Sequence, residues 1–282
     1  MAHYLPPSIN HYCSYEDVER QLELTFTADQ AEVAHVVICG VSRDIENFTG
    51  RKFYTRTETR YYDGGFGRRM LLDEDLLTVT SLTVDNDADG TYDDETWVED
   101  TDFWLTPFNS WPKNAIEVHP EGNFSLSQIR KGYKIAGIWG YGNGLEETPW
   151  QDAGVTVTFA DGTTNTGTVS EAGVLETGQT LLVGTEQIFI GSISGSNLNN
   201  CRRAANGTTG AAHTDAACQI ARYPSAIRKA CIFFSCQAFN TMAHAGMQAE
   251  SIGDYSYTAS TGGNMQMLME QLIGTYRRLV VA

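Results

Sequence analysis

The residues whose spacing best matches a metal-binding pattern form the acidic segment 85–90, Asp-Asn-Asp-Ala-Asp-Gly. Asp85, Asp87 and Asp89 stand at alternate positions before a glycine, as in the opening of a calcium loop, where carboxylates ligate a hard cation. A calcium loop would close with a glutamate at the position of Thr96, and it would lie between helices, whereas strands are predicted on both sides. An acidic turn between two strands is the favoured interpretation, and calcium at these three aspartates is the alternative.

A second candidate metal site would combine Cys201, His213 and Cys218, whose thiolate and imidazole groups are typical zinc ligands. Their spacing matches no common zinc pattern, and a fourth ligand is not evident. We therefore predict no metal or other cofactor. The six cysteines include no Cys-x-x-Cys pair, and the N-terminus shows no basic segment followed by an apolar one. These features predict reduced thiols in a protein that assembles in the cytoplasm.

The sequence contains none of the common motifs of enzyme active sites. It has no nucleophile elbow, no His-Glu-x-x-His, no Walker A motif and no dinucleotide-binding fingerprint. The glycine-rich segment 140–144 lacks the lysine of a phosphate-binding loop and is followed by Pro149, so we interpret it as a turn. We predict no catalytic residues and a protein that is not an enzyme.

The formal net charge of −16 bears on possible partners. A strongly acidic protein does not bind nucleic acid tightly by neutralising phosphates, but it is compatible with nucleic acid that slides past. No apolar run approaches the length of a membrane span, so we expect no membrane partner.

The elements that position these residues begin with a helix predicted from Thr27 to Gly50. Thr27 and Gln30 can form a capping box, and Gly50 can adopt the left-handed conformation that ends a helix. Apolar residues recur at steps of three and four, which places them on one face. Further helices are predicted from Ser14, from Pro224 to Gly246, and from Asn264 onward.

Strand patterns dominate two regions between the helices. Residues of about 54–140 contain β-prone runs separated by turn residues. Segment 151–222 is rich in Gly, Thr and Ser. We interpret it as a β-domain inserted into a core made of residues 1–150 and 223–282. We predict an α+β fold with a small antiparallel helical bundle as its core, β-strand and hairpin elaborations, and an inserted all-β lobe.

Several short segments together carry a family resemblance: 44–53; 61–64 with 75–82, Trp97 and 103–107; 224–238 with 250–257; and 184–188 with 206–213. In this combination the chain resembles the head–tail connector (adaptor) proteins of tailed bacteriophages, which form a ring under the portal. The last pair is similar to a small β module of phage connector proteins. One departure is Arg203-Ala204-Ala205, where that module usually has an Arg-Gly pair.

The resemblance implies a homo-oligomeric ring, most often of twelve copies, at the head–tail junction of a virion assembled in the host cytoplasm. The ring would dock on the portal protein, continue into a downstream neck or tail protein, and extend the channel through which genomic DNA passes without sequence-specific binding. Two alternatives remain open. The chain could be a tail terminator or stopper of the neck, or a scaffold that carries a β binding module for another virion protein or a glycan.

Partner-binding residues are expected in an aromatic, glycine-containing arm near the C-terminus and in a basic pair that follows: Ile252, Gly253, Asp254, Tyr255, Tyr257, Arg277 and Arg278. Tyrosines are frequent anchors of protein interfaces, because they combine a large apolar surface with a polar end. The arm could equally fold back on its own subunit. The arginines could contact an acidic portal surface or complement the dipole of the last helix.

Overall fold

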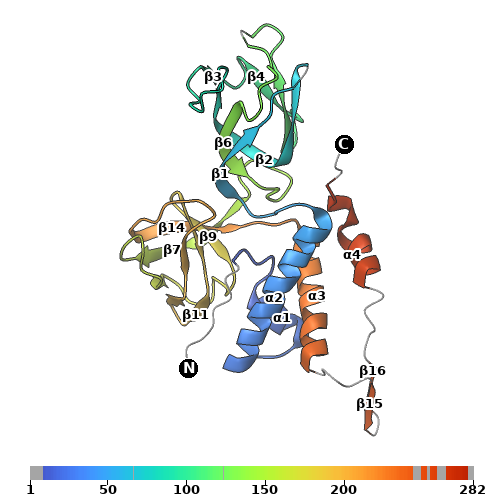
Figure 1. The fold of residues 1–282 in the computed structure, drawn as a ribbon. Helices are drawn as coiled ribbons and strands as arrows, with labels where there is room; N and C mark the ends of the chain where they lie inside the picture. Colours follow the sequence, from blue (N-terminus) through green and yellow to red (C-terminus); the bar gives the residue numbers. More distant parts are fainter. Residues whose placement is uncertain are drawn as a thin grey trace.

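The computed structural model describes residues 9–65, 67–122, 124–243, 249–252, 255–258 and 265–278. Within these residues the helices are α1 (Tyr15–Leu22), α2 (Ala28–Thr49), α3 (Ser225–Ala243) and α4 (Met265–Ile273), and a 3-10 turn, η2 (Gly274–Tyr276), follows α4. The helices form one layer, with a β-sheet above it and a second sheet beside it (Figure 1).

Each sheet draws its strands from one stretch of the chain. The first sheet contains β1 (Arg56–Tyr62), β2 (Arg69–Val84), β3 (Glu95–Trp97), β4 (Phe103–Thr106), β5 (Lys113–Val118) and β6 (Tyr133–Trp139). The second sheet contains β7 (Trp150–Phe159), β8 (Gly167–Val169), β9 (Thr180–Val183), β10 (Glu186–Phe189), β11 (Ser192–Ser194), β12 (Asn197–Asn199), β13 (Arg202–Ala205) and β14 (His213–Ala221).

Helix α2 begins and ends where its capping residues predict. The Gln30 backbone N–H donates to the Thr27 side chain, and the Thr27 N–H donates to the Gln30 side chain at 2.9 Å. Gly50 ends the helix with φ of 66°, a conformation that glycine adopts without a steric penalty. The predicted capping box and C-cap are both confirmed.

The helical layer has its own hydrophobic cluster. Ile38 and Ile45 of α2 lie fully buried against Ile227 and Phe234 of α3, and Ile273 of α4 joins them. The buried side of each helix therefore faces its neighbours in the layer. Among the described residues, no helix combines the length and apolarity needed to cross a bilayer.

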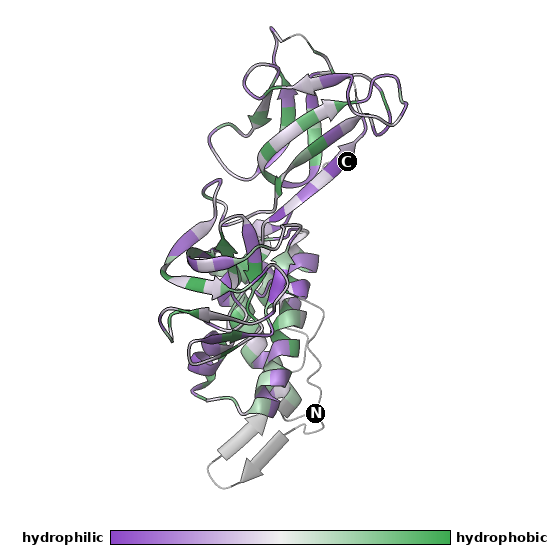
Figure 2. Cartoon of the chain, turned by 90° about the vertical axis from the view of Figure 1, so that its left-hand side faces the viewer, coloured by the Kyte–Doolittle hydropathy of each residue, from purple (hydrophilic) through white to green (hydrophobic). Residues whose placement is uncertain are grey.

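The first sheet is antiparallel, with the order β1-β6-β2-β5-β4 and β3 added to β2. The long strand β2 pairs with β5 through its first half and with β6 through its second half, and its register shifts along the way. Such irregularities bend a strand, so β2 can serve two partners. Hydrophobic and hydrophilic residues alternate along these strands (Figure 2), and Leu82, Phe103 and Trp139 lie in a separate buried cluster.

The second sheet has the order β11-β12-β8-β7-β14-β9-β10-β13 and curls into a half-barrel. Val157, Leu181, Ile188 and Cys218 lie in its buried cluster. Its first and last strands along the chain are paired, with Trp150 opposite Ala221. The chain thus enters and leaves this sheet at adjacent points.

The predicted fold class, with a helical bundle as the core, is wrong. The described chain is mostly β, and two of its three hydrophobic clusters lie in the sheets. The sheets are therefore not elaborations of the helical layer, because each buries apolar side chains of its own. Strands β8 and β12 could not be predicted from the sequence, because they have three residues each and contain Gly and Asn, which have low strand propensity.

Two histidines fill the joint between the helical layer and the second sheet. The ring of His11 lies 4.7 Å from that of His35 and 5.0 Å from that of Phe189. Both nitrogens of His11 and Nε2 of His35 are buried, and they have no hydrogen-bond partner among the residues that the structure describes. Burial lowers the pKa of both imidazoles, that of His35 to about 4, so the joint is built for neutral histidine.

Candidate functional site

The predicted arm contains an antiparallel hairpin, β15 (Ala249–Ile252) and β16 (Tyr255–Thr258). Ile252 is opposite Tyr255, and Glu250 is opposite Tyr257. Gly253 and Asp254 lie outside the described residues. The structure therefore places Ile252, Tyr255 and Tyr257 on two paired strands.

The hairpin forms a sheet of its own. Within the described part of the chain, β15 and β16 pair with each other and with no other strand. They lie beyond the end of α3, away from both larger sheets (Figure 1). A lone two-stranded hairpin is marginally stable in water. The hairpin therefore gains stability when it packs on a further surface.

The basic pair does not lie in the last turn of α4, as the dipole interpretation required. Helix α4 ends at Ile273, and the arginines follow the 3-10 turn. Arg278 is held by its own chain: its N–H donates to the Thr49 carbonyl at 2.7 Å, and its guanidinium donates to the Leu72 carbonyl at 2.6 Å. The guanidinium of Arg277 lies over the Phe48 ring, and its side chain is 58% exposed.

A small charged cavity of about 140 Å³ lies where the end of α2, the first sheet and the C-terminal segment meet. Asp75, which is 4% exposed, pairs with Arg51 at 2.5 Å and with Arg278 at 3.6 Å. Arg51 also donates to the Tyr276 carbonyl at 2.7 Å. The cavity is thus a structural junction, and Arg278 is one of its components.

Next to this junction lies a second cluster of charges around Glu74. Its carboxylate pairs with Lys52, Arg56 and Arg60. Burial alone would raise the pKa of Glu74, but the positive charges around it, Arg56 first, hold the pKa below its ordinary value. These pairs connect β1 and β2 to the chain that leaves α2.

The β-module segments 184–188 and 206–213 are brought together around a buried carboxylate. Glu186 accepts from Arg203 at 2.9 and 2.7 Å, from the N–H groups of Ala204 and Ala211, and lies 2.8 Å from His213 Nε2. Burial would raise the pKa of Glu186, but these partners, Arg203 first, lower it to about 2. The network joins the two quoted segments into one unit.

The adjacent residues attach this unit to the rest of the protein. The Gln187 side chain donates to Thr55 at 3.0 Å and accepts from Asn206 at 2.7 Å. Asn206 also exchanges hydrogen bonds with Asn10, and its carbonyl accepts from the Thr57 N–H. The module residues thus fix the second sheet to the start of the first.

The three possible zinc ligands have other partners. His213 contacts Glu186, while the Cys201 and Cys218 sulfurs lie near the carbonyls of Asn199 and Val155. In the part of the chain that the structure describes, the one group of three ligand side chains close enough to share a metal ion is a different one, Asp85, Asp87 and Asp94.

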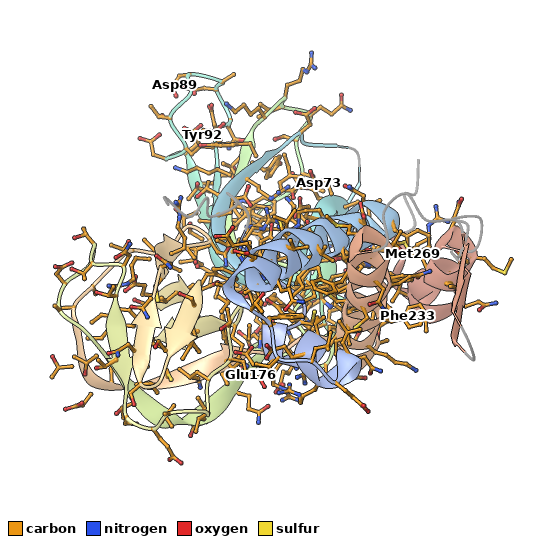
Figure 3. The ribbon with its side chains drawn as sticks, turned by 90° about the horizontal axis from the view of Figure 1, so that it is seen from below. Asp73, Asp89, Tyr92, Glu176, Phe233 and Met269 are labelled. Atoms are coloured by element: carbon orange, nitrogen blue, oxygen red, sulfur yellow. The ribbon has the colours of Figure 1, made fainter. Side chains whose placement is uncertain are left out.

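The acidic loop between β2 and β3 gathers a set of carboxylates that differs from the predicted one. Oxygen atoms of Asp85, Asp87 and Asp94 lie within 4.8 Å of one another, whereas Asp89 accepts from Thr91 at 2.7 Å. Figure 3 shows Asp89 at the outer end of the loop. Because Asp85 accepts from the Asp89 and Gly90 N–H groups, the loop has hydrogen-bond donors that balance its charge without a cation. Asp94 could not be predicted from the spacing of the aspartates, because it reaches Asp85 and Asp87 only where the loop folds back before β3.

The N–H of Asp89 favours ionised Asp87, but desolvation and, after it, the neighbouring carboxylates of Asp89, Asp94 and Asp85 raise its pKa above its ordinary value. Mutual repulsion of this kind is what a bound cation would relieve. The loop is a candidate cation site by composition, and its hydrogen bonds account for its fold.

Comparison of the chain with protein-family models gives no match, and comparison with curated proteins gives none either. Inferences about partners therefore rest on the residues and geometry described above.

Proposed function

We propose that this chain is a structural virion protein of a tailed bacteriophage that forms a homo-oligomeric ring between portal and tail. The ring extends the DNA channel and completes the packaged head. Its partners are further copies of itself, the portal protein and a downstream neck or tail protein. The proposal begins from the resemblance of several segments to head–tail connectors.

The observation that carries the proposal is the lone hairpin of β15 and β16. It pairs with neither of the larger sheets and lies beyond the helical layer (Figure 1). A two-stranded hairpin gains stability when it packs on a further surface. In a ring, the neighbouring copy or the portal supplies that surface, and tyrosines at positions 255 and 257 are suited to anchor it.

The charge of the chain agrees with a role around DNA. A net charge of −16 per copy repels phosphates, so DNA can pass without being held. Ring closure also multiplies this charge around a common axis. The proposal therefore requires no base-reading or phosphate-binding residues.

The experiment replaces the arm and leaves the helices intact. Truncation before the arm would remove α4, whose Ile273 is fully buried in the helical cluster. Residues 249–258 are instead replaced by glycine and serine, and the purified protein is imaged by electron microscopy alone and with portal. We expect rings on portal from the unaltered chain and a loss of rings or of portal docking from the variant.

The matched control replaces the exposed loop 171–173 of the second sheet in the same way. It should form rings like the unaltered chain. Normal docking by the arm variant would refute the role of the arm. Assembly on tails but not on portals would instead favour a tail terminator.

A further inference from the structure

Helix α2 presents an exposed stripe that the described part of the chain does not cover. Asp29, Val33, Val36, Gly40 and Asp44 follow one another at steps of three and four, so they share a side of the helix, here called the α2 face. Val33 is 37% exposed and Val36 is 52% exposed. Two adjacent exposed valines followed by a glycine form an apolar strip between two acidic residues.

No contact within the described residues explains why position 40 of the helix is a glycine. A Cβ atom placed there would meet no atom within 4 Å, so nothing in the fold requires its absence. Glycine weakens the interior of a helix, because its backbone is freer in the unfolded chain. A glycine on an open helix surface permits another backbone or a large side chain to approach closely. The position is therefore suited to a surface that comes from outside this chain.

Helix α3 presents a second exposed patch of different charge. Lys229 and Phe233 lie one turn apart on one side of it, here called the α3 face, and Cys236 in the next turn on that side is buried. Phe233 is 45% exposed, and Figure 3 shows it on the side of the helical layer away from the second sheet. Helix α3 contains no acidic residue, and Lys229 forms no ion pair within the described residues. The α3 face is thus an exposed aromatic ring beside an unpaired cation.

The two faces point in opposite directions. Ser42 Oγ of α2 lies 3.6 Å from Cys231 Sγ of α3, so these residues mark where the helices face each other. Gly40 precedes Ser42 by two positions, and Phe233 follows Cys231 by two. Two positions correspond to about 200° around a helix, so Gly40 and Phe233 project away from the contact on opposite sides.

The two faces also complement each other in shape and charge. The α2 face has an open notch at Gly40, and the α3 face has a protruding ring at Phe233. Asp29 and Asp44 form no ion pair within the described residues, and neither does Lys229. The α3 face thus carries an unpaired cation beside an aromatic ring. The α2 face carries unpaired carboxylates beside an apolar strip, so the charges of the two faces are opposite.

We propose that the α2 face of one copy docks on the α3 face of the next, with Phe233 seated over Gly40 and Lys229 near Asp44, since each charged residue lies one helical turn from its contact residue. Because the two faces lie on opposite sides of one copy, the contact is heterologous, and repeating it generates a ring or a filament. The proposal deepens the ring function proposed above and rests on it for closure of the ring. The contact itself involves no portal residue.

The test uses two variants of the full chain, each blocked on one face. Gly40→Gln fills the notch, where its side chain meets open space, so the thermal midpoint of the protein should not fall. Phe233→Asp removes the ring and adds repulsion toward Asp44. By analytical ultracentrifugation, each variant alone should need at least about tenfold more protein than the unaltered chain to assemble.

Mixing the two variants gives the decisive result. Gly40→Gln retains an intact α3 face and Phe233→Asp an intact α2 face, so the mixture should form a dimer that grows no further. The matched control is Leu145→Asp, which alters an apolar residue that is 75% exposed and belongs to neither face but to the segment between β6 and β7, and it should assemble normally.

Three results would overturn the proposal: unchanged assembly of either variant, a mixture that stays monomeric, or an unaltered chain that stays monomeric at every concentration. If the contact between copies is right but the connector function is wrong, the experiments give a different result. The variants and their mixture would then behave as expected while assemblies of the unaltered chain failed to dock on portal.

Discussion

At the scale of single residues, Ala204 has a backbone conformation that favours glycine. Its φ of 51° lies in the left-handed region, at the position where the resembling β module usually has a glycine. Its N–H donates to Glu186 at 2.9 Å, so the buried network holds the conformation in place. The turn forms with alanine, but the alanine side chain is strained.

Ala204→Gly should therefore stabilise the protein by about 1 kcal/mol, because glycine adopts this conformation without the clash that alanine suffers. Urea unfolding measures the gain. The neighbouring Ala205, which is buried in β13, is the control: Ala205→Gly should lower stability, because glycine weakens a strand. A loss of stability in Ala204→Gly would show that the strain has been assigned to the wrong residue.

Glu186 should give the second sheet a marked dependence on acid. Its folded-state pKa of about 2 lies below the ordinary value of 4.5, so its contribution is complete above pH 4.5. The contribution is lost as the pH falls from 4.5 toward about 2, because the unfolded chain binds the proton first. Glu186→Gln leaves Arg203 buried without its anion, and should lower stability near neutral pH by about 3 kcal/mol.

The measurement is the urea midpoint as a function of pH between about pH 6 and about pH 3. The midpoint of the unaltered chain should fall more steeply than that of Glu186→Gln over this range. Parallel curves would mean that other carboxylates dominate the acid response.

At the scale of elements, the loop between β2 and β3 shows how backbone donors can stabilise a cluster of carboxylates. Asp85 and Asp94 each accept two backbone N–H groups. We therefore expect the melting curve to be unaffected by a calcium chelator. A midpoint that rises with added calcium and falls with the chelator would establish a cation site at Asp85, Asp87 and Asp94.

Elements that are stabilised by residues close together in the sequence were predicted correctly, whereas contacts between residues far apart in the sequence were not. Helix α2 was predictable because Thr27, Gln30 and Gly50 act within a turn of the residues that they cap. The carboxylate network was not, because Arg203 and His213 reach Glu186 only through strand pairings that a linear pattern does not reveal. The same holds for Arg278, whose partners Thr49 and Leu72 lie far away in sequence.

At the scale of the whole molecule, three hydrophobic clusters divide the described chain into a helical layer and two sheets. The second sheet is self-contained, because all of its strands come from one segment whose first and last residues, Trp150 and Ala221, are paired. It meets the rest of the protein through Gln187 and Asn206, through the histidine joint, and through contacts of Glu176 and Thr177 with α1.

Segment 150–221, produced alone, should therefore fold and unfold cooperatively. Near-ultraviolet circular dichroism and urea unfolding provide the measurement, and Glu186→Gln in the same segment provides a destabilised control. A segment without a cooperative transition would show that the joint with the helices is required for folding.

The buried histidine pair has a practical consequence for imaging assemblies of this protein. His35 carries a pKa of about 4 in the folded chain against an ordinary 6.5, so acidification from pH 6.5 toward about pH 4 progressively favours the unfolded, protonated chain. The uranyl stains used for electron microscopy are acidic. Grids stained in this way would weaken the joint between the second sheet and the helices during the observation itself, so neutral stain or vitrified ice is the appropriate preparation.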